Sequence, residues 1–451
     1  MKNKSTQKNN FRQFFAGKKI TVMGLGILGR GLGYTKFMAE CGADLIVTDL
    51  KTKKELASSI KELGKFKNIQ FVLGEHRLED FRNRDMILKA AGVPMNSPFI
   101  EEARQNSIPI EMDVSFFAKL SPSTILVGVT GTRGKSMTTA LIYEILRKNE
   151  KVLKGKVYLG GNMRGIATLP LLRKTSLALG KTIVVCELDS WQLQGFGDAK
   201  ISPQVSVFTS FMPDHMNYYK DDLKKYFNDK ANIFKYQKKG DLLVVRPLVR
   251  KLIPKNLKST LLVVDPKTAQ KYEFVVPGTH QRENLACAIE VAKYFKIPKT
   301  NIEKAVKNFK GLEGRMQYLL KINGVKIYND NNATTPEATI AGIEALVNEK
   351  IILISGGSDK GLDTKKLVGM MEKNCKKVIL LTGTGTAKLP LISNSIKVKS
   401  LNEAVRTALK EAKKGDIILF SPAFASFGPP PGGFKNEYDR GDQFIDIVKR
   451  I

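Results

Sequence analysis

A short glycine-rich segment of the chain could do chemistry on a nucleotide. The residues Thr130-Gly131-Thr132-Arg133-Gly134-Lys135-Ser136 follow the apolar run Ile125–Val129 and precede a helical pattern. In such a turn, backbone N–H groups cradle phosphate, a lysine neutralises it, and a serine hydroxyl can hold Mg²⁺. The strict GxxxxGK[ST] spacing fails, because position 129 is Val and Gly128 lies one residue too early. The strand–turn–helix context still predicts ATP binding.

A second glycine-rich turn lies near the start of the chain. Gly24-Leu25-Gly26-Ile27-Leu28-Gly29 follows the apolar run Ile20–Met23, and Asp49 stands twenty residues after Gly29. This pattern presents N–H groups and a helix N-terminus to a diphosphate, and the acid can bind a ribose. It predicts a diphosphate-bearing nucleotide without saying which one. A glycine-rich turn that holds no ligand is the structural alternative.

Three further polar side chains lie at or after the ends of apolar runs. Glu187 ends the run Thr182–Glu187, and open α/β sheets bind ligands at that edge. Its carboxylate could hold Mg²⁺ beside the phosphate turn, or could lie in solvent. His215 follows the run Val205–Thr209, and Lys230 comes fifteen residues later. Taken alone, such a histidine is more often structural, and such a lysine is more often solvated on a helix.

The elements that must position these residues alternate along the chain. Apolar runs predict strands over Lys19–Met23, Leu45–Thr48, Met86–Lys89, Ile125–Val129, Thr182–Glu187, Val205–Thr209, Asp241–Val245, Leu261–Val264, Lys350–Ser355, Lys377–Thr382 and Asp416–Phe420. Amphipathic patterns predict helices over Ser136–Lys148, Arg282–Phe295, Pro336–Asn348 and Leu401–Lys413. This alternation favours an α/β protein with mainly parallel sheets that are covered on both faces.

The 451 residues divide at two breaks in the pattern. Ser121-Pro122-Ser123-Thr124 precedes a new strand, and Gly311-Leu312-Glu313-Gly314 precedes a fresh strand–turn pattern. We therefore expect three domains, over residues 1–121, 122–313 and 314–451. They are a Rossmann-like N-terminal domain, a central P-loop ATPase domain and a Rossmann-like C-terminal domain. The segment Gly428–Gly433 is rich in Pro and Gly and predicts a loop.

Composition narrows the choice of partners. The formal charge is +31, but the basic residues are spread along the chain and are not interleaved with stacking aromatics. We therefore expect no nucleic-acid partner, although a basic field would attract anionic substrates such as nucleotides. The four cysteines form no CxxC pair, which fits a reducing compartment. No apolar run approaches the ~20 residues that span a bilayer, so we expect a cytoplasmic protein without a membrane partner.

In their order along the chain, these motifs resemble the Mur ligases and their folylpolyglutamate synthase relatives. The resemblance rests on TGTRGKS, the strand ending in Glu187, Asp214-His215 and Lys230, and it runs over nearly the whole chain. It implies an ATP-dependent, ADP-forming amide ligase of peptidoglycan precursor synthesis, and so a role in cell-wall biogenesis, cell shape and cell division. The substrate carboxylate would attack the γ-phosphate of ATP, and an amine would then attack the resulting acyl phosphate.

Within the family, four features resemble the member that adds glutamate to UDP-N-acetylmuramoyl-L-alanine. They are the N-terminal GxGxxG domain, the LGGN segment that ends at Asn162, the SPA segment at 421–423 and the FKN-x-x-x-RG segment at 434–441. The implied partners are this UDP-linked substrate and a free amino acid, with D-glutamate favoured. A monomeric enzyme is expected.

The resemblance also implies a role for each matching residue. The UDP substrate would contact Gly24, Gly26, Ile27, Leu28, Asp49 and Asn162. ATP would contact Gly131, Thr132, Arg133, Gly134, Lys135, Ser136, Asn284, Arg315 and Asp330. Lys135 and the metal-binding residues would be catalytic, with Mg²⁺ bound by Ser136, Glu187, His215 and a carbamylated Lys230. The incoming amino acid would contact Thr334, Lys360 and Ser426.

The chain departs from the family pattern at several positions. Arg133, Ser136 and Asp189 stand where Asn, Thr and Ser are usual. Changes near the acceptor site are the replacement of a Ser-Lys pair by Asn331 and Asn332, the inserted segment 428–433, and Glu437 in place of an aromatic residue. These changes leave the acceptor open, with L-glutamate as one alternative.

Three other functions stay open from the sequence. A folylpolyglutamate synthase-like ligase is disfavoured by the N-terminal GxGxxG domain. A nicotinamide-dependent dehydrogenase would leave the GTRGKS segment unexplained, and a P-loop ATPase acting on nucleic acid lacks a basic and aromatic patch.

Overall fold

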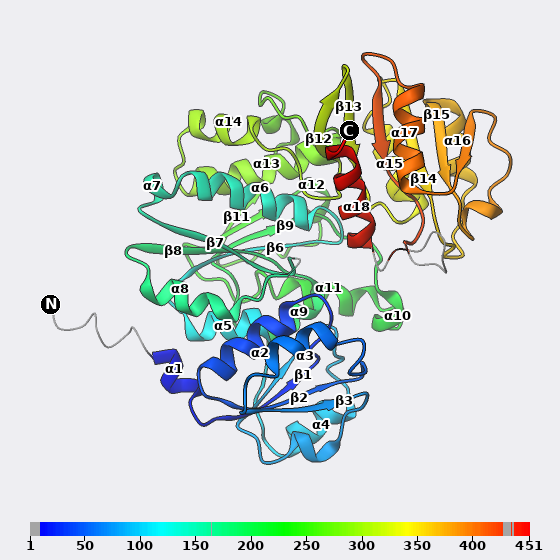
Figure 1. Ribbon diagram of the computed structural model, residues 1–451. Helices are drawn as coiled ribbons and strands as arrows, with labels where there is room; N and C mark the ends of the chain where they lie inside the picture. The colour runs from blue at the N-terminus through cyan, green and yellow to red at the C-terminus, as the bar shows by residue number, and fades with distance from the viewer. Residues whose placement is uncertain (1–9, 164, 427–433, 435–436) are drawn as a thin grey trace. The chain divides into compact units, whose positions relative to one another are not determined.

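The computed structural model of the protein contains three β-sheets with helices packed around them (Figure 1). It describes residues 10–163, 165–426, 434 and 437–451. The predicted loop at Gly428–Gly433 lies outside the described residues. The chain forms two compact units. The first holds the chain up to Thr268 together with Ala286–Ile302, and the second holds Ala269–Leu285 together with the chain from Glu303 onward.

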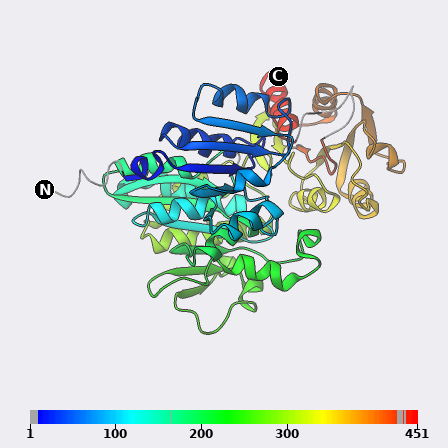
Figure 2. The same ribbon diagram turned by 90° about the horizontal axis from the view of Figure 1, so that it is seen from below.

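The first sheet has five parallel strands in the order β3-β2-β1-β4-β5. Its strands are β1 (Lys19–Met23), β2 (Asp44–Asp49), β3 (Ile69–Leu73), β4 (Met86–Lys89) and β5 (Ile110–Glu111). Helices α2 (Arg30–Glu40) and α3 (Ala57–Leu63) cover one face, and α4 (Pro98–Gln105) lies on the other. Two short helices, α1 (Asn10–Phe15) and η1 (Leu78–Phe81), also belong to this part of the chain. Figure 2 shows the blue strands of this sheet side by side. Because both faces are covered, the neighbouring residues Ile20 and Thr21 of β1, whose side chains point to opposite faces, are both fully buried.

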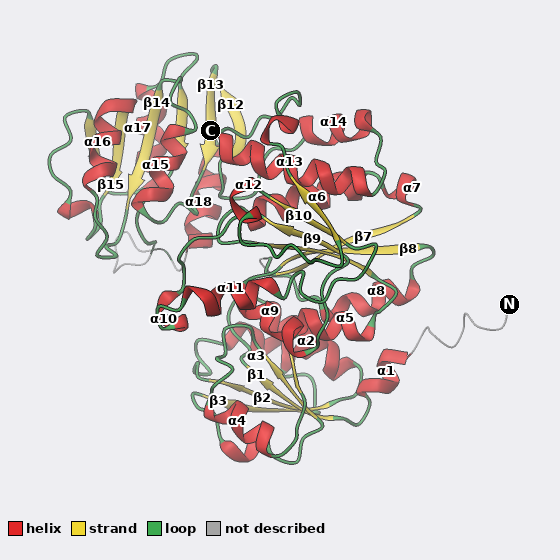
Figure 3. Ribbon diagram, turned by 180° about the vertical axis from the view of Figure 1, so that it is seen from behind, coloured by secondary structure: helices red, strands yellow, loops and turns green. Residues whose placement is uncertain are grey.

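The second sheet has six parallel strands in the order β11-β10-β9-β6-β8-β7. They are β6 (Ile125–Thr130), β7 (Gly155–Gly161), β8 (Lys181–Glu187), β9 (Val205–Phe208), β10 (Leu242–Val245) and β11 (Thr260–Val263). Helix α6 (Lys135–Lys148) lies over one face, and α8 (Leu172–Leu177) and α9 (Ser190–Asp198) lie over the other (Figure 3). The remaining helices up to residue 307 are α5 (Asp113–Leu120), α7 (Glu150–Leu153), η2 (Leu169–Leu171), α10 (Met216–Tyr219), α11 (Leu223–Ala231), α12 (Pro247–Arg250), η3 (Pro266–Ala269), α13 (Thr279–Tyr294) and α14 (Lys299–Lys307).

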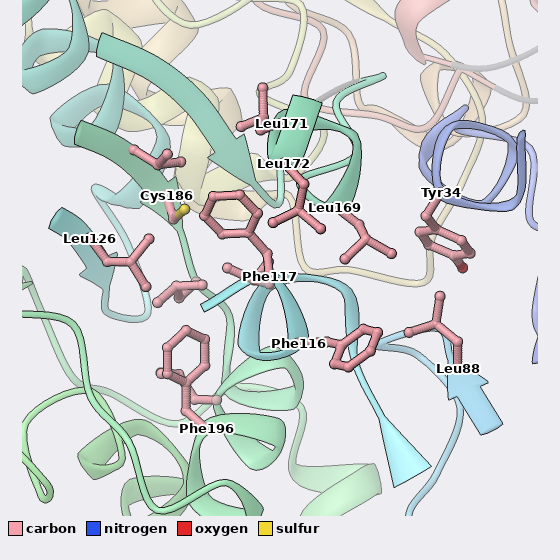
Figure 4. Close-up of a cluster of buried hydrophobic side chains, with 14 of the residues drawn as sticks. Tyr34, Leu88, Phe116, Phe117, Leu126, Leu169, Leu171, Leu172, Cys186 and Phe196 are labelled. Carbon is pink, nitrogen blue, oxygen red and sulfur yellow. The ribbon is translucent and has the colours of Figure 1, made fainter. Parts of the chain in front are cut away.

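One apolar core joins the first two sheets through helix α5. Figure 4 shows Phe117 of α5 on the side of Leu126 and Cys186, which belong to the second sheet. Phe116 of the same helix lies toward Leu88 of the first sheet. All five side chains are buried in one cluster. The loops at the ends of both sheets are therefore held by a shared core within the first unit.

The third sheet belongs to the second unit and has the order β12-β13-β17-β14-β15-β16. Its strands are β12 (Gln317–Ile322), β13 (Val325–Asn329), β14 (Ile351–Gly356), β15 (Cys375–Leu381), β16 (Ser395–Val398) and β17 (Ile417–Phe420). Only the hairpin pair β12 and β13 is antiparallel among the pairings of this sheet. Helices α15 (Pro336–Glu344), α16 (Lys365–Asn374), η4 (Thr386–Lys388), α17 (Leu401–Glu411) and α18 (Glu437–Lys449) complete the unit.

The α/β class and every expected strand are confirmed, with ends that differ by at most two residues. The expected helix over Pro336–Asn348 is too long, because α15 ends at Glu344. Strands β3, β5, β7, β12, β13 and β16 were not expected. The three domain ranges stay a prediction. Among the described residues, no helix has the length and apolar character needed to cross a membrane.

Candidate active site

A cavity of about 300 Å³ lies at the carboxyl ends of β1 and β4, in the first unit. The chain order reverses between these two strands, and ligands of open α/β sheets bind at such a switch point. Of the residues expected to bind the UDP moiety, the cavity is lined by Gly24, Gly26, Ile27, Leu28 and Asp49. The structure therefore brings these five residues together around one hollow.

Asp49 organises the glycine-rich turn. Its two carboxylate oxygens accept the backbone N–H groups of Gly26 and Lys51, each at 2.8 Å. The hydroxyl of Tyr34 donates to the Gly24 carbonyl at 2.9 Å. Gly24 has a φ of 94°, which favours glycine, and an added Cβ would lie 2.8 Å from the Cβ of Ala90. Asp49 thus shapes the turn, and its contact with a ribose stays a prediction.

The phosphate turn packs against the loop that follows β9. Gly131 has a φ of 143°, and an added Cβ would lie 2.1 Å from Oγ1 of Thr209, so only glycine fits. The Thr209 hydroxyl donates to the Thr130 carbonyl at 3.0 Å, and the Thr132 hydroxyl donates to the Met212 carbonyl at 3.1 Å. Ser136 lies in the first turn of α6, where N–H groups lack partners within the helix. The strand–turn–helix arrangement expected here is present, and phosphate binding at the turn stays a prediction.

Two lysines converge on one carbonyl of this turn. Nζ of Lys135 donates to the Gly131 carbonyl at 2.9 Å, and Nζ of Lys230 donates to the same oxygen at 3.0 Å. Lys230 comes from α11, is 1% exposed, and lies 4.8 Å from the ring centroid of Tyr226. Burial, together with the charge of Lys135, lowers the pKa of Lys230 from 10.5 to about 7. Near neutral pH its amine is therefore partly neutral.

Glu187 ends β8 with one carboxylate oxygen unsatisfied. The side chain is 4% exposed, Nδ2 of Asn162 lies 3.4 Å from Oε1, and Oε2 has no hydrogen-bond partner among the described residues. Asn162 thus lies beside Glu187 rather than among the cavity residues. A buried acceptor without a donor is costly, so this oxygen fits a cation. No three His, Cys, Asp or Glu side chains of the described chain form a metal site by themselves, but Mg²⁺ commonly takes further ligands from phosphate and water.

His215 is the N-cap residue that precedes α10, and it has a left-handed φ of 56°. Its ring lies 4.6 Å from the ring centroid of Trp191, and Nε2 lies 3.8 Å from Oδ2 of Asp214. The guanidinium of Arg133 lies 3.5 Å from the same carboxylate, which gives that unusual residue a partner. Asp214 and Glu187 both favour the charged form of Lys230, so they share its electrostatic surroundings.

The second unit brings some of its expected ligands together. Nζ of Lys360 donates to Oγ1 of Thr334 at 3.0 Å, which places these two expected amino-acid ligands side by side. Ser426 is buried, and its hydroxyl has no hydrogen-bond partner in the described part of the chain. Burial raises the pKa of Asp330 to about 7, although its carboxylate accepts the Met316 N–H and the Ser421 hydroxyl.

Two other expected nucleotide ligands differ in exposure. Asn284 is buried, its amide donates to the Gln281 side chain at 3.0 Å, and its Oδ1 is without a partner within the described ranges. Arg315 is exposed after the turn that starts at Leu312. Asn284 thus offers an acceptor and Arg315 offers donors, and their contact with a nucleotide stays a prediction.

The sequence predicted no role for two buried cations, Arg440 of the segment 434–441 and Lys89. Arg440 is 1% exposed, and its Nε donates to Oδ1 of Asn331 at 2.8 Å, so Asn331 has a structural role. Lys89 lines the cavity described above. The only sequence signal for Lys89 was a charge at the end of the apolar run Met86–Lys89. The side chain of Glu437 lies outside the described residues.

Three family models match successive parts of the chain. They are the Mur ligase MurD-like N-terminal domain at residues 18–111, the Mur ligase middle domain at 129–248 and the Mur ligase glutamate ligase domain at 314–424.

Similar proteins match over nearly the full length. The UDP-N-acetylmuramoylalanine--D-glutamate ligase of Roseiflexus sp. is 34% identical over 96% of this chain and 99% of its own. The enzyme of the same name from Borreliella burgdorferi is 33% identical over 95% of this chain and 97% of its own. In fold, the chain is similar to UDP-N-acetylmuramate-alanine ligase from Thermotoga maritima, with a TM-score of 0.58, 19% identity and coverage of 96% and 99%. It is also similar to the MurF ligase of that organism in complex with ADP, with a TM-score of 0.56, 18% identity and full coverage of both chains.

Proposed function

This chain belongs to the Mur ligase family, and on that premise we propose that it joins D-glutamate to UDP-N-acetylmuramoyl-L-alanine in peptidoglycan precursor synthesis. The reaction consumes ATP and releases ADP and phosphate. The observation that carries the proposal is the phosphate turn, where Lys135 and Lys230 meet on the Gly131 carbonyl. The full-length likeness to D-glutamate ligases supports the choice of substrates.

The UDP moiety occupies the cavity at the ends of β1 and β4. The turn N–H groups of residues 24–29 bind its diphosphate, while Asn162 contacts the muramoyl group. The substrate carboxylate attacks the γ-phosphate of ATP and gives an acyl phosphate and ADP. Lys135 offsets the charge that develops on the transferring phosphoryl group. The amine of the amino acid then attacks the acyl carbon, and phosphate leaves.

Ser136, Glu187, His215 and a carbamylated Lys230 hold Mg²⁺ in this proposal. The unsatisfied Oε2 of Glu187 supports the assignment. When bound, the metal neutralises phosphate charge. Thr132 fixes the turn to the loop after β9, and Asn284, Arg315 and Asp330 contact the nucleotide. Thr334, Lys360 and Ser426 bind the amino acid.

An ADP-release assay tests the proposal. The purified protein receives UDP-N-acetylmuramoyl-L-alanine and ATP with each member of a panel of D- and L-amino acids. We expect the fastest release with D-glutamate and none without the UDP substrate. Best turnover with L-glutamate, or with a neutral or basic amino acid, would reject this acceptor and keep the ligase chemistry. We place the reaction in the cytoplasm, where ATP is supplied, and expect a monomer, which light scattering checks.

A further inference from the structure

Lys89 is a buried cation in the wall of the cavity at the ends of β1 and β4. Its side chain is 1% exposed, and it lies at the carboxyl end of β4. Nζ donates to the carbonyls of Ala90 at 3.3 Å and Val93 at 2.9 Å. A lysine ammonium has three donors, so one donor remains beyond these two neutral acceptors. Asp189 and Asp198 favour its charged form, but within the described ranges neither carboxylate forms an ion pair with Nζ. A buried ammonium group without a directly bound counter-ion is costly, which is the first sign that an anion belongs here.

The carboxylates of the same wall are committed to backbone donors. Asp49 accepts two N–H groups of its own region, as described above. Asp113 accepts the N–H groups of Thr168 at 2.8 Å and Leu169 at 2.7 Å. Burial lowers the pKa of Lys89 to about 8, so the ammonium form still predominates at neutral pH. Lys89 therefore brings a buried positive charge to the wall of the cavity.

The turn that Lys89 holds touches the glycine-rich turn. A Cβ added to Gly24 would lie 2.8 Å from Cβ of Ala90 and 3.6 Å from Cγ2 of Val93. These are the two residues whose carbonyls Lys89 binds. The ammonium group and the N–H groups of residues 24–29 thus belong to two loops in contact, both lining one cavity.

We propose that Lys89 supplies the positive charge that binds the diphosphate of the UDP substrate in this cavity, beside the N–H groups of the glycine-rich turn. The inference rests on the proposed function and adds a residue to its substrate site. The positive charge of Lys89 should strengthen binding of a ligand that carries a diphosphate. It should not strengthen binding of the uncharged nucleoside.

Two substitutions separate charge from support of the loop. Lys89→Gln keeps donors for the two carbonyls and removes the charge, whereas Lys89→Arg keeps both. Binding of UDP and of uridine is measured by ligand-observed NMR and calorimetry. Because a charge-assisted hydrogen bond is worth roughly 1.5–3 kcal/mol, Lys89→Gln should weaken UDP binding about tenfold or more. Uridine binding should change less than about twofold, and Lys89→Arg should stay within about threefold of wild type for UDP.

Lys67→Met is the matched control, because it removes one lysine charge at an exposed position of the same domain. It should leave both affinities unchanged. If Lys89→Gln does not fold, Lys89→Met removes both the charge and the donors, and the loss of UDP binding relative to that of uridine then separates the two effects. The inference is overturned if the uncharged variants bind UDP as well as wild type does. It is also overturned if they weaken UDP and uridine equally, which would show support of the loop alone. Wild-type protein that binds UDP but releases no ADP would contradict the proposed function and leave this inference standing.

Discussion

The carbonyl oxygen of Gly131 accepts hydrogen bonds from two ammonium groups, those of Lys135 and Lys230. Lys135 and Lys230 repel each other there, and this repulsion adds to burial in lowering the pKa of Lys230. A nucleotide phosphate at the turn would satisfy both charges at once. The two neighbouring ammonium groups therefore favour the binding of an anionic ligand at this turn.

Lys135→Ala should remove ligation while leaving the fold intact. Lys135 lies at the start of α6, where the proposed mechanism uses its charge to stabilise the phosphoryl group in transfer. Losing such a contact costs several kcal/mol in the transition state, or roughly 10³-fold or more in rate. ADP release measures the effect, and Lys148→Ala at the other end of the same helix serves as the control. Near-normal turnover by Lys135→Ala would reject the ATP site.

Lys230 is expected to carry a carbamate in the active enzyme. Carbamylation requires a neutral amine, and with a pKa of about 7 roughly half of the amine is neutral at pH 7. The carbamate would replace a cation by an oxygen ligand, which Mg²⁺ prefers. Incubation with ¹³C-labelled CO₂ should give a carbamate signal by NMR, and the signal should be lost in Lys230→Ala.

Turnover provides the functional half of that test. Lys230→Ala should be inactive and should regain some activity when short carboxylic acids are added. Wild-type protein should lose activity in CO₂-depleted buffer. A fully active Lys230→Ala would remove the carbamate from the mechanism.

At the scale of elements, the sequence predicted the strands that are apolar and the turns whose contacts are local. The strands of the sheet interiors are runs of Ile, Leu and Val, whereas β7 contains three glycines and was overlooked. The phosphate turn was found because strand, turn and helix follow one another. Arg440 could not be placed, because its partner Asn331 is 109 residues away in the chain. Only the folded sheet brings them together.

Gly131→Ala should destabilise the first unit. The added methyl group would lie 2.1 Å from Oγ1 of Thr209 and 2.8 Å from N of Ser210, and the φ of 143° disfavours any side chain. We expect a loss of about 1–3 kcal/mol, together with loss of activity. Fluorescence of Trp191, the only tryptophan of the chain, follows urea unfolding of this unit.

A glycine of the second unit provides the control for that measurement. Gly369 lies in α16 and has nothing within 4 Å of an added Cβ. Gly369→Ala should leave the Trp191 transition where it is. If both variants unfold at the same urea concentration as wild type, the close packing of the phosphate turn is wrong.

At the scale of the whole molecule, the three family domains follow one another in the order expected for UDP substrate, ATP and amino acid. The sequence predicted this order because each domain carries its own local motif. It could not explain Asn331, which departs from the family pattern. In the structure the Asn331 side chain accepts a hydrogen bond from the buried Arg440, which gives this residue a structural role. Lys360 donates a hydrogen bond to Thr334, so a cation lies beside a hydroxyl group where the amino acid is proposed to bind.

The excess of basic residues also acts at the scale of the whole chain. A net charge of +31 creates a field that attracts ATP and the UDP substrate, and salt screens it because the Debye length falls from about 10 Å at 0.1 M to about 3 Å at 1 M. We therefore expect kcat/KM for ATP to fall severalfold as KCl rises, with kcat nearly constant. Sucrose at matched osmolality is the control and should leave kcat/KM unchanged. Equal falls of kcat and kcat/KM would show that salt disturbs the catalytic step, and salt-sensitive DNA binding that stimulates ATP hydrolysis would instead support a nucleic-acid partner.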